Sequence, residues 1–77
     1  MRDLAQFRLL TKDSTVAEVK RQVGEPDGDL GSGIYMYFWK LDDGTRVIVG
    51  TPDNSRVLYV DWMKADGTTE RIIEGAR

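Results

Sequence analysis

Apolar residues recur with a helical period in the first third of the chain. Between residues 15 and 24, three valines fall on one stripe, with charged or amide side chains between them. This spacing predicts a helix with one buried side. Thr15 and Glu18 have the capping-box spacing at its start, and Gly24 suits the left-handed conformation that ends many helices.

Residues 3–10 also carry apolar side chains at every third position. These are Leu4, Phe7 and Leu10. The spacing suits either a short helix or an irregular segment that packs along one edge of the core. The pattern leaves both alternatives open.

From residue 34 onward the apolar residues follow the two-residue period of strands. Strands are predicted at residues 34–41, 45–50 and 56–63, and residues 68–73 are a fourth strand or a frayed end. Turns are predicted at residues 42–44, 51–55 and 65–67. The sequence therefore predicts an α+β fold, in which a short N-terminal helix or helices pack on one face of a three- to four-stranded antiparallel meander.

Both faces of the first predicted strand are apolar. Alternation places Tyr35, Tyr37, Trp39 and Leu41 on one face, and Ile34, Met36, Phe38 and Lys40 on the other. In the third predicted strand, Leu58, Val60 and Trp62 share a face without charge. We assign that face to the helix side, because Asp61 marks the opposite face as partly solvated.

The turn at residues 42–44 decides which face of the first strand joins the core. A three-residue loop with a glycine bulge pairs Trp39 with Val47, whereas a two-residue loop pairs Phe38 with Val49. Both registers fit the sequence. In either one, a second apolar face is left for the N-terminal segment, a second copy of the chain or another molecule to cover.

Composition limits the classes of function. The chain has 77 residues, of which 40% are hydrophobic and 31% charged, so we expect a single globular domain over residues 1–77, either complete or excised from a longer protein. The formal net charge is −2 and the basic residues are scattered, which argues against nucleic acid as a partner. The longest apolar run is too short to span a bilayer, so direct membrane insertion is not expected.

No combination of residues predicts catalysis. The chain has neither histidine nor cysteine, so it lacks the commonest general base, the thiolate nucleophile and the usual zinc ligands. The glycine-rich residues 28–33 resemble a phosphate-binding loop, but they follow a helix and enter a strand, so we interpret residues 25–33 as a flexible connector. The pairs Asp27 with Asp29 and Asp42 with Asp43 lack the ligand spacing of a calcium loop. We expect no enzyme activity, no catalytic residue, no metal and no cofactor.

Three short stretches carry a family resemblance over roughly residues 10–70. The segment from Thr15 to Asp27, the GSG that precedes the aromatic strand, and LDDGT at residues 41–45 resemble small α+β domains related to β-lactamase inhibitor protein and to lipoproteins of the SmpA/OmlA type. The nearest pattern is that of uncharacterised proteins of Gram-positive bacteria. The resemblance implies a helix on a curved antiparallel sheet, no catalysis and, in the inhibitor branch, an aromatic-rich sheet face that grips a protein. The chain departs from both branches, because it is a single unit without cysteine, and inhibition of β-lactamase has no support.

We therefore expect a protein–protein interaction module that binds a protein partner through an aromatic-rich sheet face. The candidate contact residues are Tyr35, Tyr37, Trp39 and Tyr59, since aromatic residues dominate interface energetics. The alternatives are a sensory or structural domain of a larger cell-envelope or membrane protein, which would place it outside the cytoplasm, and a structural unit that self-associates as a homodimer.

Overall fold

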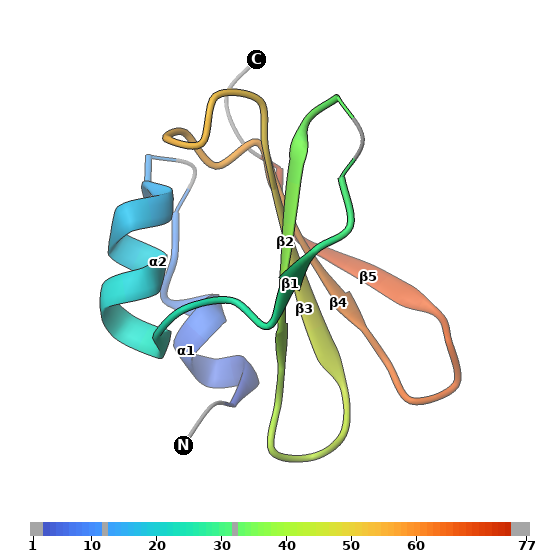
Figure 1. Ribbon diagram of the computed structural model, residues 1–77. Coiled ribbons are helices and arrows are strands. Elements are labelled where there is room, and N and C mark those ends of the chain that lie inside the picture. Colours follow the sequence, from blue (N-terminus) through green and yellow to red (C-terminus); the bar gives the residue numbers. More distant parts are fainter. Residues whose placement is uncertain (1–2, 12, 32, 75–77) are drawn as a thin grey trace.

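The computed structural model describes residues 3–11, 13–31 and 33–74, and it has an α+β fold with five strands (Figure 1). The elements are α1 (Leu4–Arg8), α2 (Val16–Val23), β1 (Gly28–Asp29), β2 (Tyr35–Lys40), β3 (Arg46–Thr51), β4 (Tyr59–Met63) and β5 (Thr69–Glu74). The strands form one antiparallel sheet in the order β1-β2-β3-β4-β5. The predicted α+β meander is confirmed. The predicted number of strands, three to four, is wrong because β1 adds a fifth.

β1 lies within the segment that was predicted to be a flexible connector. Backbone hydrogen bonds extend its pairing with β2 at both ends, from Asp27 N–H to the Phe38 carbonyl and from Leu30 N–H to the Met36 carbonyl, both 2.8 Å. The Asp29 carboxylate accepts a further bond from the Met36 N–H at 2.9 Å. Glycine and acidic residues therefore build an ordered edge strand here. Ser32, also part of the predicted loop, lies outside the described residues.

α2 begins and ends where its sequence predicts. The Thr15 hydroxyl oxygen accepts the Glu18 N–H at 3.2 Å, and the hydroxyl donates to the Glu18 carboxylate at 3.4 Å. At the other end, Gly24 has a φ of 86° and its N–H donates to the Lys20 carbonyl at 2.8 Å. A residue with a side chain rarely adopts that φ, so glycine ends the helix cleanly.

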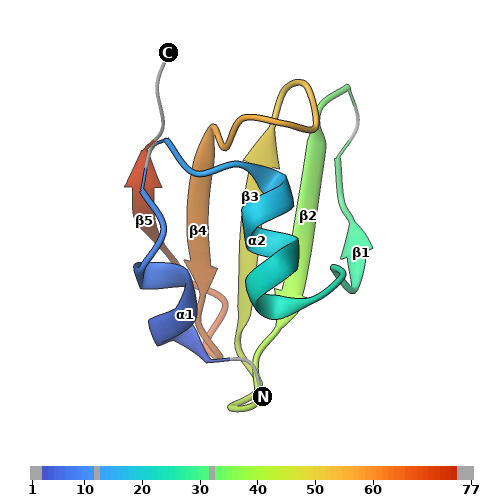
Figure 2. The ribbon, with the colours of Figure 1, turned by 90° about the vertical axis from the view of Figure 1, so that its left-hand side faces the viewer.

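The N-terminal segment, predicted as either a short helix or an irregular segment, contains the short helix α1. The Asp3 carboxylate accepts the Gln6 N–H at 3.2 Å, and the Gln6 side-chain oxygen accepts the Asp3 N–H at 2.9 Å. This reciprocal capping box supports a helix of five residues. Both helices lie on the same side of the sheet (Figures 1 and 2), so the N-terminal segment does not cover the other face.

The β2–β3 hairpin has the three-residue loop, one of the two registers that the sequence leaves open. Trp39 pairs with Val47, and Gly44 has a φ of 88° at the last loop position. That conformation is typical of the glycine bulge that closes such a hairpin. The register places the face that contains Trp39 under the helices.

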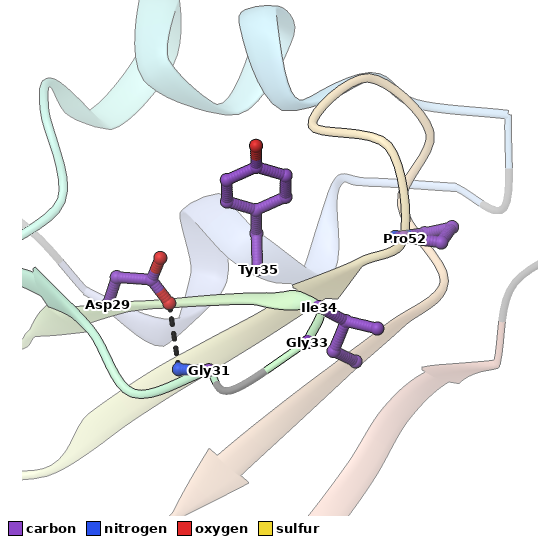
Figure 3. Close-up of a pocket in the computed structure, with 6 residues that line it drawn as sticks. All are labelled: Asp29, Gly31, Gly33, Ile34, Tyr35 and Pro52. Carbon is purple, nitrogen blue, oxygen red and sulfur yellow. Dashed lines mark hydrogen bonds between the residues drawn. The ribbon is translucent and has the colours of Figure 1, made fainter.

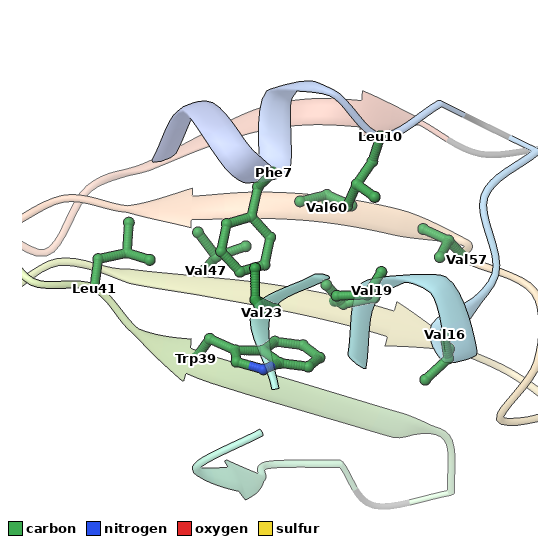
Figure 4. Close-up of a cluster of buried hydrophobic side chains, with 11 residues drawn as sticks. Phe7, Leu10, Val16, Val19, Val23, Trp39, Leu41, Val47, Val57 and Val60 are labelled. Atoms are coloured by element: carbon green, nitrogen blue, oxygen red, sulfur yellow. The ribbon is translucent and has the colours of Figure 1, made fainter. Parts of the chain in front are cut away.

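The core lies between the two helices and one face of the sheet (Figure 4). Its buried members are Phe7, Leu10, Val16, Val19, Val23, Trp39, Leu41, Val47, Val49, Val57 and Val60. The assignment of one β4 face to the helix side is confirmed, since Val60 is fully buried and Trp62 packs partly against the core. Among the described residues, neither helix is long and apolar enough to cross a membrane.

The β3–β4 turn is organised by one carboxylate. Asp53 accepts the backbone N–H groups of Arg56 at 2.9 Å and Ser55 at 3.0 Å, and the Arg56 guanidinium donates to it at 3.0 Å. These bonds, of which those from Arg56 matter most, lower the pKa of Asp53 from 3.8 to about 2. The next residue, Asn54, has a φ of 61°, a left-handed conformation that asparagine tolerates better than most residues.

Removing the Phe7 ring is expected to destabilise the domain strongly, because the ring is fully buried and belongs to a helix of only five residues. Phe7→Ala should lower the free energy of unfolding by about 3–5 kcal/mol. The matched control is Leu9→Ala, which removes a side chain that is 75% exposed and should change stability by less than about 0.5 kcal/mol. Urea unfolding followed by tryptophan fluorescence measures both. Equal losses in the two variants would contradict the packing described for α1.

The low pKa of Asp53 predicts a pH-dependent contribution to stability. Its folded-state pKa lies below the ordinary value of 3.8, so its contribution is present above about pH 4 and is lost as the pH falls toward 2. The difference in urea midpoint between the wild type and Asp53→Asn should therefore be largest near neutral pH and shrink in acid. A difference that stays constant from pH 7 to about pH 2 would show that Asp53 does not titrate in this way.

Candidate functional site

The structure divides the four candidate contact residues between the two faces of the sheet. Tyr35, Tyr37 and Trp39 follow one another on the helix side of β2, whereas Tyr59 projects from β4 on the opposite face. The register explains this division, because Tyr59 pairs with Gly50 and Tyr37 pairs with Val49. The four residues do not form one surface.

The three aromatic residues of β2 form a row whose exposure increases away from the core. Trp39 is fully buried, with its ring centroid 5.8 Å from that of Phe7. Tyr37 is half-buried and meets Trp39 edge-on at 6.4 Å. Tyr35 is 42% exposed and stacks on Tyr37 at 5.8 Å with 16° between the rings. Trp39 is therefore a core residue, and Tyr35 is the residue of the row whose side chain is accessible to a partner.

Tyr37 contacts two other elements of the fold. Its hydroxyl donates to the Asn54 side-chain oxygen at 2.8 Å, and the Lys20 ammonium of α2 lies 5.0 Å from its ring centroid. Burial, followed by the negative charge of Asp29, raises the pKa of its hydroxyl. These contacts connect β2 to α2 and to the β3–β4 turn, so the role of Tyr37 in the fold is structural.

A hollow of about 420 Å³ opens beside Tyr35 (Figure 3). It is lined by Asp29, Gly31, Gly33, Ile34, Tyr35 and Pro52. The Asp29 carboxylate is its charged group, and it already accepts the N–H groups of Gly31 and Met36, at 2.8 and 2.9 Å. Those bonds, led by the one from Met36, lower the pKa of Asp29. The carboxylate is therefore held by backbone N–H groups of the β1–β2 connection and of β2.

The sheet face opposite the helices, which we call the open face, has no helix over it among the described residues (Figure 1). Strand pairing assigns to it Gly28 of β1, Met36, Phe38 and Lys40 of β2, Arg46, Ile48 and Gly50 of β3, Tyr59, Asp61 and Met63 of β4, and Thr69, Arg71 and Glu74 of β5. Alternation adds Ile34 and, across the β1–β2 turn, Leu30. In Figure 3, Ile34 points away from the side on which Tyr35 lies. The open face is thus the second apolar face that the sequence predicted.

Phe38 on the open face lies between a glycine and an arginine. A Cβ at Gly28 would lie only 2.6 Å from the Phe38 ring, so the ring rests on the β1 backbone. The Arg46 guanidinium carbon lies over the same ring, 5.6 Å from its centroid. The ring therefore lies low on the sheet, with a cation above it.

Tyr59 repeats this arrangement two strands away. A Cβ at Gly50 would collide with its ring, and the Arg71 guanidinium carbon lies 4.5 Å from its centroid. Arg71 also donates two hydrogen bonds to the Asp61 carboxylate, at 2.5 and 3.3 Å. Glycines beneath and arginines above keep both rings flat against the sheet.

These contacts enclose the centre of the open face. Ile48 is only 7% exposed although no helix among the described residues lies over it, so its neighbours on the sheet must bury it. Apolar exposure is concentrated instead at the end near the β1–β2 turn, where Leu30 is 51% and Ile34 is 36% exposed. We call Leu30, Ile34 and Met36 the apolar end.

The opposite end of the open face is cationic. Lys40 and Arg46 are exposed and lie directly across from each other in the β2–β3 ladder. Among the described residues, no carboxylate forms an ion pair with either side chain. We call these two residues the cationic end. The sequence analysis missed the pair, because the two residues become neighbours only in the three-residue register.

Acidic residues that were considered as calcium ligands accept hydrogen bonds from other residues of the chain. Asp27 accepts the Lys40 N–H at 2.7 Å, and Asp43 accepts the Thr45 N–H and hydroxyl at 2.9 and 2.6 Å. The bonds from Thr45 lower the pKa of Asp43. Within the described part of the chain, no three acidic side chains converge on a point where a metal ion would sit.

Comparison with known proteins finds no match to a family model, a curated protein or a solved structure. The fold and the site define the class no further than a small α+β domain with helices on one face of its sheet and an open second face. The resemblance to the inhibitor and lipoprotein domains was not tested by these comparisons and stays a prediction.

The contact between Tyr59 and Gly50 can be measured with a double-mutant cycle. In the wild type, Gly50→Ala should cost about 1–3 kcal/mol of stability, because the new methyl group displaces the Tyr59 ring. In a Tyr59→Ala background the same change should cost clearly less, which gives a coupling of about 1 kcal/mol or more. Urea unfolding of the four proteins measures it. An equal cost of Gly50→Ala in both backgrounds would contradict the described position of the ring.

Proposed function

We propose that this chain is a non-enzymatic protein–protein interaction module and that the open face is its contact surface. The observation that carries the proposal is the exposed apolar end, which continues into the half-buried Phe38 and Tyr59 rings. Both helices pack on the other side of the sheet, so no described helix stands between this face and a second protein. Contiguous exposed apolar surface is typical of interaction sites.

The residue types of the open face support the same proposal. Its large side chains are two methionines, a phenylalanine, a tyrosine and two arginines, in addition to aliphatic residues. Aromatic residues, methionine and arginine are enriched in protein interfaces, whereas lysine and acidic residues, here Lys40 and Asp61, are depleted there. Of the four candidate contact residues, Tyr59 belongs to this surface.

The size of the molecule sets the scale of such an interface. The Cα atoms extend over 29 × 24 × 20 Å, which gives the largest face an outline of about 700 Å² before the side chains are added. A partner in a standard interface contributes about 800 Å², so a specific complex would use almost the whole open face. Both the apolar end and the cationic end would then contact the partner.

The proposed family relationship is consistent with this function. In the inhibitor branch, the resemblance implies a protein-binding sheet face, and the open face is the sheet face that no described helix covers here. A homodimer and a domain of a larger cell-envelope protein are the alternatives, and the following experiment separates the homodimer from binding to another protein.

Site-specific photo-crosslinking in the organism that encodes the chain tests the proposal. A benzoylphenylalanine placed at Leu30, on the open face, should form a discrete adduct with another protein. The matched control places it at Ala17, which is exposed on α2 in the opposite layer, and should not form that adduct. An adduct between two copies of this chain would indicate the homodimer instead. Absence of any adduct from Leu30, or identical adducts from both positions, would reject the open face as the contact surface.

A further inference from the structure

The cationic end of the open face is unfavourable for the fold by itself. Lys40 and Arg46 are directly opposite each other in an antiparallel pair, and like charges in that position are destabilising. Elsewhere on the face a cation has a carboxylate partner, since Arg71 bonds to Asp61. The chain has acidic residues in excess, with a net charge of −2, yet none of the described ones forms an ion pair with either side chain. An uncompensated pair of this kind suits an anionic group of a partner.

A hollow of about 330 Å³ lies at the same end, between the β2–β3 and β4–β5 turns. Its lining residues are Gly44, Arg46, Met63, Lys64, Ala65 and Gly67. Of its two cationic residues, Lys64 is ion-paired with Glu70 at 3.4 Å, which leaves Arg46 as the cation without a described carboxylate partner, and the glycines keep the walls low. A carboxylate side chain of a partner would fit there, with Arg46 as its hydrogen-bond donor.

The apolar end lies at the other end of β2. Lys40 comes six positions after Ile34, and at the rise of a strand this distance is about 20 Å. The region between the two ends is filled by the Phe38 ring and the Arg46 side chain above it. The open face is therefore polarised along β2, with apolar side chains at one end and positive charge at the other.

We infer that the partner of the open face is a protein segment with large apolar side chains at one end and a group of aspartate or glutamate side chains about 20 Å away. This inference rests on the proposed function and identifies the class of partner. The carboxylates neutralise Lys40 and Arg46, and the apolar side chains cover Leu30, Ile34 and Met36. Charge complementarity sets the orientation of the segment on the sheet.

The same observations disfavour the two other occupants. By strand pairing the open face has three cations and two acids, so a second copy docked face to face would bring a second net positive charge and no further acid for Lys40 and Arg46 than this face already has. A nucleic acid needs aromatic rings that bases can stack on, but Phe38 and Tyr59 each have a glycine on one side and an arginine on the other.

Peptide selection tests the inference on the intact chain. Phage-displayed random peptides of about 12 residues are long enough to reach both ends when extended. Peptides enriched on the immobilised chain should combine a cluster of acidic residues with large apolar residues. Synthetic fluorescent copies should bind less tightly at about 0.5 M salt than at about 0.05 M. An oligothymidylate of similar length serves as the nucleic-acid probe.

Charge-reversal variants test whether the enriched peptide binds at the cationic end of the open face. Lys40→Glu and Arg46→Glu should each weaken binding of the enriched peptide by about tenfold, whereas the matched control Arg21→Glu, on the exposed side of α2, should leave it unchanged. Lys40→Glu should at the same time raise the urea midpoint, because it converts a like-charge pair into an opposite-charge pair. Weaker binding in a more stable protein excludes unfolding as the cause.

Each other outcome overturns a defined part of the proposal. Enrichment of neutral or basic peptides whose binding is lost in Leu30→Glu would overturn the acidic partner and leave the proposed function intact. Failure to enrich any peptide, or binding that none of the open-face variants changes, would overturn the proposed function as well. Tighter binding of the oligothymidylate than of any peptide would replace a protein partner with nucleic acid.

Discussion

The burial of the Trp39 indole is the contact on which the other features of this small domain depend. The ring is fully buried against Phe7 of α1, and its Nε1–H donates to the Gly24 carbonyl at the end of α2 at 3.0 Å. One side chain of the sheet thus contacts both helices. An indole N–H removed from water without an acceptor would cost stability, so the helix C-cap and the sheet must form together.

This contact also determines what the second face becomes. Since Trp39 faces the helices, its neighbours Phe38 and Lys40 must face the other way, and a chain of 77 residues has no further element among those described to place over them. The open face compensates locally, because Phe38 and Tyr59 rest on glycines and carry arginines above them. As a result, Ile48 at the centre of this face is buried although no described helix lies over it.

Local signals were sufficient to predict α2 with its caps, the α+β class and the three turns of the meander, because Gly24, Gly44 and the apolar periods act over a few residues. They were not sufficient for β1, whose glycine and acidic residues favour a loop until Phe38 and Met36 supply pairing partners. The division of the candidate contact residues between the two sheet faces could not be predicted either, because it also depends on strand pairing. Which face Tyr37 or Tyr59 occupies depends on the register of a hairpin, and two registers fitted the sequence.

The contrast between the two ends of the open face argues for selection beyond folding. Stability alone would favour an acidic residue opposite Arg46, since opposite charges across a ladder are stabilising and the chain places such a pair at Asp61 and Arg71. Likewise, Leu30 and Ile34 contribute little to the core while exposed, so polar residues would serve the fold as well. Two departures from what folding favours, on one face and at opposite ends of one strand, are explained together if a partner covers both.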